Sequence, residues 1–187
     1  MKLTISKRVS ERKSDAKKLR RSAQVPGVLY GLEGDNQNIS FPLDQLQAIL
    51  REIRQGLLST TVFELSDGDT THRALIKEIQ YHPASYAVLH ADFCLVSHKK
   101  PVTVTVPIQV TGLADCVGIK GGGFMRQVIR AMKVSCPHNK IPQEFLLDVR
   151  ELDISQSKTL ADIVIPAGIK PLAKMNEVAV VIAKRAG

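Results

Sequence analysis

A histidine and an aspartate stand two positions apart in the segment Val88–Phe93, which has the composition of a strand. Residues two apart in a strand project from the same face, so His90 and Asp92 form one polar patch. An imidazole and a carboxylate can together hydrogen-bond base edges or ribose hydroxyls of a nucleic acid. The same pair also occurs on a solvated sheet edge or around a structural histidine, and the sequence leaves both interpretations open. His82, near the end of another candidate strand, has the same two interpretations.

Positive charge is concentrated at the N-terminus. Residues 1–30 contain nine lysines and arginines and two acids, whereas the other 157 residues contain 17 basic and 16 acidic side chains. The chain, with a formal net charge of +8, therefore has an almost neutral body and a basic N-terminal segment. Such clustering predicts a polyanionic partner, either a nucleic acid or an anionic membrane surface. A transit peptide has a similar composition, but here the basic segment leads directly into sequence typical of a folded domain.

A short helix is predicted inside this basic segment. Ser14 or Asp15 can cap it, and Pro26-Gly27 ends it. One of its faces carries small or apolar residues: Ala16, Leu19 and Ala23. The remaining circumference is basic: Lys17, Lys18, Arg20 and Arg21. A membrane-surface role is disfavoured, because the helix has about two turns and lacks bulky apolar anchors on one face.

An enzyme that uses a cysteine is the alternative to a protein that binds a polyanion. The three cysteines, Cys94, Cys116 and Cys136, are odd in number and far apart, which favours free thiols in a reducing cytosol. A cytosolic hydrolase or transferase that used Cys94 or Cys136 would need a histidine beside the thiol, and the sequence alone does not exclude one. A zinc site is disfavoured, because the candidate ligands lack the paired short spacings of structural zinc.

The glycine and aromatic contents narrow the kind of ligand. The glycine-rich segment Gly118–Gly123 has the spacing of neither a P-loop nor a dinucleotide fingerprint, so it predicts a β-turn or bulge. The chain has no tryptophan, three tyrosines and five phenylalanines. Because single strands are bound by stacking on successive aromatic side chains, this composition favours a structured duplex.

The hydrophobic pattern predicts a mainly β protein with two domains. In residues 1–96, short strands and two helices, the second from about residue 43 to 54, indicate a small antiparallel β-barrel of α+β type. Residues 97–101 are a predicted linker, and residues 102–187 are predicted to form an all-β, sandwich-like domain. The strands expected in this second domain include residues 126–135, 163–165 and 178–183.

Several blocks of sequence together resemble one known family. Arg12–Gly31, Ile76–Pro83 and Val88–Phe93 resemble the bacterial ribosomal large-subunit protein L-twenty-five, a family that binds 5S ribosomal RNA. In the C-terminal half, Val104–Gly112 and Gly118–Gly122 resemble the long form of that family, known as the CTC or general stress type. Each block is weak alone, but the blocks cover nearly the whole chain in order, and together they are specific.

The resemblance implies a barrel-like N-terminal domain that docks on an irregular internal loop of 5S ribosomal RNA, largely through the minor groove. The RNA-binding residues that it implies are Arg8, Lys13, Lys17, Lys18, Arg20, Arg21, Tyr30, Gln80, His82, His90 and Asp92. Arg12 stands where the family usually has glycine. If that glycine lets the backbone approach the RNA, the contact near Arg12 differs from the one in the family.

The resemblance further implies a structural component of the large ribosomal subunit in the cytoplasm, and not an enzyme. Its implied partners are 5S ribosomal RNA, the large subunit and, through the C-terminal domain, neighbouring ribosomal proteins, with no membrane. No cofactor is expected apart from Mg²⁺ bound to the RNA at the interface. A stress-induced, ribosome-associated RNA-binding factor is the alternative within the same class.

Overall fold

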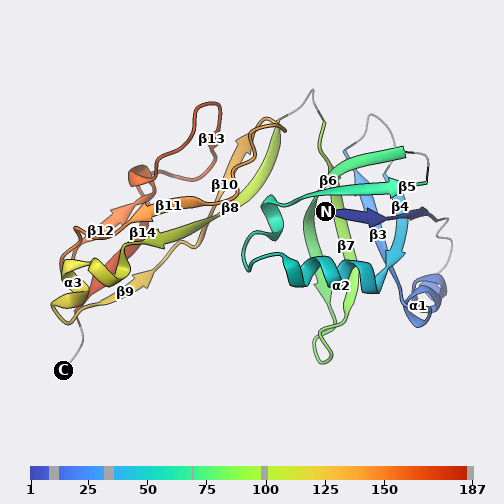
Figure 1. Cartoon of the computed structure of the whole chain (residues 1–187), viewed down its shortest axis with the longest axis horizontal. Helices are drawn as coiled ribbons and strands as arrows, with labels where there is room; N and C mark the ends of the chain where they lie inside the picture. Colours follow the sequence, from blue (N-terminus) through green and yellow to red (C-terminus); the bar gives the residue numbers. More distant parts are fainter. Residues whose placement is uncertain (9–12, 32–35, 69, 98–100, 185–187) are drawn as a thin grey trace. The chain divides into compact units, whose positions relative to one another are not determined.

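The computed structural model describes residues 1–8, 13–31, 36–68, 70–97 and 101–184 (Figure 1). By its internal contacts the chain divides into two compact units, Met1–Lys100 and Pro101–Gly187. Each unit buries its own set of apolar side chains.

The N-terminal unit is a mainly β structure with two α-helices. Its elements in chain order are β1 (Lys2–Thr4), β2 (Ser6–Lys7), α1 (Lys13–Arg21), β3 (Gln24–Tyr30), β4 (Gln37–Pro42), α2 (Leu43–Glu52), the 3-10 turn η1 (Leu58–Thr60), β5 (Val62–Asp67), β6 (Thr70–Tyr81) and β7 (Val88–Leu95). The strands form one sheet in the order β1-β5-β6-β7-β3-β4-β2.

The N-terminal segment nearly closes this sheet into a barrel. β1 and β2 pair at opposite edges of the sheet, although Ile5 alone separates them in the chain. The Ile5 amide donates a hydrogen bond to the carbonyl oxygen of Ser66 at 2.8 Å, so the segment stays on the barrel between its two pairings. The predicted small β-barrel with two helices is thus confirmed. The prediction of an antiparallel sheet is wrong in part, because β1 runs parallel to β5 and β3 runs parallel to β7, so the sheet is mixed.

Three phenylalanines fill the barrel. Phe93 meets Phe41 and Phe63 edge to face, with ring centroids 5.5 and 6.2 Å apart, and all three rings are fully buried. The apolar stripe of α2 adds the buried side chains of Leu46 and Ile49 to the same core. Burial of each of these side chains contributes about 1.5–3 kcal/mol to stability.

Gly27 is required where β3 passes between β4 and β7. A Cβ atom on Gly27 would lie 2.6 Å from the Ala91 carbonyl oxygen and 2.9 Å from Phe41 Cε1. We expect Gly27→Ala to lower the free energy of unfolding by about 1–3 kcal/mol, because the strands or the ring must shift. Urea unfolding of the full chain measures this. Gly121→Ala is the matched control, since its added Cβ meets no atom closer than 3.4 Å, and an equal loss there would contradict the steric explanation.

The first helix ends earlier than the sequence pattern predicts. α1 ends at Arg21, and Ala23 has a left-handed φ of 56°, so the prediction that Ala23 extends its apolar face is wrong. The left-handed residue turns the chain into β3, and the carbonyl of Ala23 accepts a hydrogen bond from the Leu43 amide at 2.9 Å. Ser14 and Asp15 lie within the helix rather than capping it, because α1 begins at Lys13.

The C-terminal unit is also β-rich, as predicted. Its elements are β8 (Val102–Thr111), the 3-10 turn η2 (Leu113–Asp115), α3 (Val117–Lys120), β9 (Phe124–Gln127), β10 (Ala131–Cys136), β11 (Phe145–Asp148), β12 (Ser157–Thr159), the 3-10 turn η3 (Leu160–Asp162), β13 (Lys170–Pro171) and β14 (Val178–Ala183). They form a four-stranded sheet, β11-β8-β10-β13, and a three-stranded sheet, β12-β14-β9.

Three local predictions for this unit are corrected. Residues 126–135 form two strands in different sheets, because the amides of Val128 and Ile129 bond to Ala179 of β14 and the Arg130 carbonyl then bonds to Ile108 of β8. Residues 163–165 form no strand and follow the turn η3. The glycine-rich segment 118–123 begins inside the one-turn helix α3, where a β-turn or bulge was expected.

Candidate nucleic-acid interface

The outer surface of three adjacent strands carries a group of polar side chains. Pairing of β6 with β7 places Gln80 beside His90 and Glu78 beside Asp92. Pairing of β3 with β7 places Tyr30 beside Cys94, which follows Asp92 by two residues in β7 and so lies on the same face. Ala91 and Phe93 point into the core, so His90, Asp92 and their partners point outward. We call Tyr30, Glu78, Gln80, His90 and Asp92 the polar sheet face.

His90 and Asp92 are in direct contact on this face. His90 Nδ1 donates to Asp92 Oδ1 at 2.7 Å, and the side chains are 21% and 35% exposed. The carboxylate therefore fixes the orientation of the ring and leaves Nε2 for another partner. In the part of the chain that the structure describes, Nε2 has no hydrogen-bond partner. The pair thus offers an imidazole edge and a second carboxylate oxygen to a ligand.

His82 is held by the turn that follows β6. Its Nδ1 accepts hydrogen bonds from the amides of Ala84 and Ser85 at 3.3 and 3.2 Å. A nitrogen that accepts carries no proton, so the neutral ring has its proton on Nε2. This residue is exposed and presents Nε2 as a donor at the end of the strand that also carries Gln80.

Tyr30 lies half-buried at the end of β3. Burial raises the pKa of its phenol, and the nearby Cys94, Asp92 and Glu78 raise it further. The phenol therefore stays protonated at neutral pH and can donate a hydrogen bond to a phosphate or ribose oxygen.

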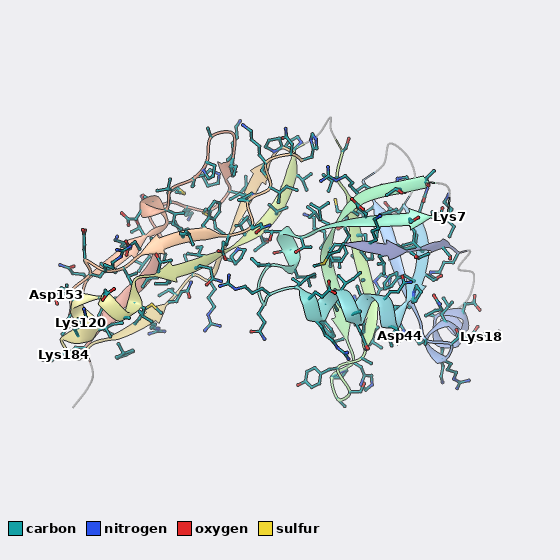
Figure 2. The ribbon with its side chains drawn as sticks, in the orientation of Figure 1. Lys7, Lys18, Asp44, Lys120, Asp153 and Lys184 are labelled. Carbon is teal, nitrogen blue, oxygen red and sulfur yellow. The ribbon has the colours of Figure 1, made fainter. Side chains whose placement is uncertain are left out.

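The basic helix α1 presents four cations to solvent. These exposed residues are Lys17, Lys18, Arg20 and Arg21, and Figure 2 labels Lys18 among them. Lys13 begins the helix, but its side chain and the whole of Arg12 lie outside the described residues. The half-buried Leu19 faces the other way, and α1 packs against β3.

Arg20 attaches this helix to β7, one of the strands that carry the polar sheet face. Its Nε and Nη2 atoms donate to the carbonyl oxygen of Leu89 at 3.1 and 3.0 Å. Leu89 immediately precedes His90, so the structure brings the basic helix next to the His90–Asp92 pair. Two of the five Arg20 donors are used in this way, and the other three remain for a ligand.

Arg8 lies close to the same helix. Its Nε donates to the carbonyl oxygen of Ile39 at 2.9 Å. Burial, and then the positive charge of Arg20, lower the pKa of Arg8, while Asp15 opposes them. Arg8 therefore lies within electrostatic range of both the Arg20 guanidinium and the Asp15 carboxylate.

A shallow pocket of about 470 Å³ opens between Arg8 and α1. Its lining residues are Arg8, Asp15, Lys18, Leu19 and Ser22. The pocket thus combines the positive charges of Arg8 and Lys18 with the negative charge of Asp15.

The structure also exposes aromatic side chains that the sequence interpretation did not single out. Tyr81 is 46% exposed at the end of β6, and Tyr86 is 78% exposed in the following turn. The signal in the sequence was their position on either side of His82-Pro83, where a strand ends. Glu78, the neighbour of Asp92, was also missed.

The cysteines lack the features of a catalytic nucleophile. Cys116 and Cys136 are buried, and their thiols donate to the carbonyls of Leu152 and Val102. Burial raises the pKa of the half-buried Cys94 thiol, and Lys77 opposes this shift. A thiol with a raised pKa is mostly protonated at neutral pH and is a poor nucleophile.

The described residues contain neither a cluster of metal ligands nor a membrane-spanning helix. No group of three or more histidine, cysteine, aspartate or glutamate side chains there is arranged to hold a metal ion. None of the helices in the described part of the chain has both the length and the apolar character needed to cross a membrane.

Comparison with known proteins matches both units. Residues 3–93 match the model of the Ribosomal L25p family, and residues 101–186 match that of the Ribosomal protein TL5, C-terminal domain. The chain is 40% identical to the "Large ribosomal subunit protein bL25" of Chlamydia abortus over 185 residues, which cover 99% of this chain and 100% of the relative. The protein of the same name from Chlamydia pneumoniae is 38% identical over the same shares of the two chains.

Proposed function

Because the chain belongs to the Ribosomal L25p family, in the form with a TL5-type C-terminal domain, we propose that its N-terminal unit binds 5S ribosomal RNA at an internal loop. As a ribosomal protein of the large subunit it is cytoplasmic and is not an enzyme. The proposed interface consists of α1, Arg8, the polar sheet face and His82.

The observation that carries this proposal is the attachment of α1 to β7 through Arg20. The two hydrogen bonds to Leu89 hold a row of exposed cations beside the hydrogen-bonding groups of His90 and Asp92. A nucleic acid presents the same combination, with charged phosphates flanking a groove of polar edges. Neither the helix nor the sheet alone would match both features.

The two parts of the interface have different tasks. Lys17, Lys18 and Arg21 contact phosphates, which gives affinity that falls with salt and carries little sequence information. His90, Asp92 and Gln80 meet the wide minor groove of an RNA helix, where 2′-hydroxyls and base edges are accessible. An aspartate on a phosphate-binding surface is favourable only when it accepts from such a hydroxyl or amino group.

For the C-terminal unit we propose contacts with neighbouring ribosomal proteins. Of the eleven exposed large apolar side chains among the described residues, eight lie in this unit, including Val164, Leu172 and Leu146. Protein interfaces bury apolar side chains at their centres, whereas contacts with RNA depend on cations.

The test is a salt titration of RNA binding by the full chain. A short duplex that contains the 5S internal loop is compared with a regular A-form duplex of equal length by filter binding. We expect tighter binding to the loop at every salt concentration, and affinities for both that fall steeply with salt. Equal affinity for the two duplexes would reduce the interface to a nonspecific cationic patch and overturn the proposal.

A further inference from the structure

The turn between β6 and β7 carries the most exposed large aromatic side chain in the described residues. We call residues 82–87 the hairpin tip. The ring of Tyr86 is 78% exposed, and the strand end before the tip carries the 46% exposed Tyr81. Figure 1 shows the tip projecting beyond the end of the barrel, as a continuation of β6 and β7.

The backbone of Tyr86 has an unfavourable conformation. Its φ is +54°, in the left-handed region that bulky L-residues rarely adopt and that glycine or asparagine adopts readily. The turn holds it there, because the Tyr86 amide donates to the His82 carbonyl at 2.9 Å and the His82 amide donates to the Ala87 carbonyl at 2.8 Å. The ring of His82 adds two hydrogen bonds from the amides of Ala84 and Ser85.

The hydrogen bonds of the turn are made by its backbone and by His82, and the side chain of Tyr86 takes part in none of them. In the described part of the chain, the Tyr86 hydroxyl has no hydrogen-bond partner and its ring contacts no other aromatic ring. The left-handed backbone of Tyr86 costs free energy. Its largely exposed side chain buries little apolar area and so contributes little to the stability of the fold. Glycine would adopt this backbone conformation at a lower cost in free energy. The presence of tyrosine therefore indicates that the ring makes a contact outside the chain.

We infer that Tyr86 stacks on a nucleotide of the RNA next to the internal loop, so that the hairpin tip is a second contact beside the polar sheet face. This inference rests on the proposed function. Tyr86 precedes His90 by four residues, which places their Cα atoms at most about 14 Å apart. The RNA that lies against His90 therefore passes within reach of the ring.

The chemistry of the tip fits an irregular RNA. An unstacked base in or beside an internal loop is recognised by stacking on an aromatic ring, and one ring suffices for one base. The Nε2 donor of His82 lies in the same turn and can bond the phosphate or ribose of that nucleotide. The turn is fixed before binding, so little conformational entropy is lost when the ring stacks.

The test replaces Tyr86 in the full chain by glycine, asparagine or phenylalanine. Glycine and asparagine tolerate the left-handed conformation, so we expect the thermal midpoints of Tyr86→Gly and Tyr86→Asn to match or exceed that of the unsubstituted protein. Both should weaken binding to the internal-loop duplex by about 5- to 150-fold, the range for loss of one stacked base. Tyr86→Phe keeps the ring and should keep most of the affinity. Substitution of 2-aminopurine at unpaired positions of the duplex identifies the stacked base by its fluorescence quenching.

The outcomes separate this inference from the proposed function. If the unsubstituted protein prefers the internal loop and the glycine and asparagine variants bind it equally well, the stacking inference is overturned and the proposed function stands. If those variants keep their RNA affinity but enter large subunits poorly, the ring contacts a protein and the inference is again overturned. If the unsubstituted protein shows no preference for the loop, the proposed function and the inference both fail.

Discussion

Replacing Lys17, Lys18 and Arg21 together with alanine is expected to lower the affinity for the 5S internal-loop duplex by about 100-fold at physiological salt. Each phosphate contact releases about 0.7–0.9 of a counterion, which near 0.15 M salt corresponds to roughly a fivefold gain in affinity. The slope of log K against log salt should therefore become shallower by about 2–3. Because the three side chains are exposed, the stability of the protein should change by less than about 1 kcal/mol.

A matched control separates position from total charge. Lys133, Lys170 and Lys174 are exposed lysines of the C-terminal unit, and their replacement with alanine also reduces the formal net charge from +8 to +5. We expect this control to bind nearly as tightly as the unsubstituted protein. If both triple variants lose the same affinity, general attraction by net charge explains the binding and α1 has no special role. Arg20 stays unchanged in these variants, because its hydrogen bonds to Leu89 position the helix.

Local sequence pattern was sufficient to predict the class of fold and one feature of the site. Alternation of apolar and polar residues indicated the strands of the barrel, and period two placed His90 and Asp92 on one face. The closure of the barrel was beyond this approach, because β1 and β2 are three and two residues long and pair at opposite edges. Such short strands carry almost no pattern of their own, and their partners are set by distant parts of the chain.

The polar sheet face depends on a bulge that alternation does not predict. Ile76 pairs with Phe93 and points inward, and strict alternation from Ile76 would turn Gln80 inward as well. A shift in register between Ile76 and Glu78 inserts Lys77 as an extra residue, after which Glu78 and Gln80 point outward. The bulge therefore brings Gln80 beside His90.

The joining of helix and sheet could not be read from the sequence either. Arg20 and Leu89 are 69 residues apart in the chain, and the bond uses a backbone carbonyl, which every residue type possesses. The basic segment predicted a polyanion and the His90–Asp92 pair allowed a groove contact, but their adjacency is a property of the fold. Tyr86 is a similar case, because a count of aromatic residues says nothing about which ring is exposed.

Removing the carboxylate of Asp92 is expected to change the two RNA affinities in opposite directions. Asp92→Ala takes a negative charge away from a surface that faces phosphates, so binding to the regular duplex should become slightly tighter. Binding to the internal-loop duplex should weaken by about 10- to 100-fold, the range for a lost hydrogen bond to a charged group. The preference for the loop would then largely disappear, while the salt slope, which counts phosphate contacts, should stay the same.

Two further substitutions assign this effect to recognition. Asp92→Asn keeps an oxygen that can accept from His90 Nδ1, so the ring stays oriented, and we expect a loss smaller than that of Asp92→Ala. Asp44→Ala removes one exposed negative charge from α2, which contributes no residue to the polar sheet face; Figure 2 labels Asp44. It should raise the affinity for both duplexes slightly and equally. If Asp92→Ala behaves like Asp44→Ala, the carboxylate contributes only its charge, and discrimination of the loop must come from other groups than the His90–Asp92 pair.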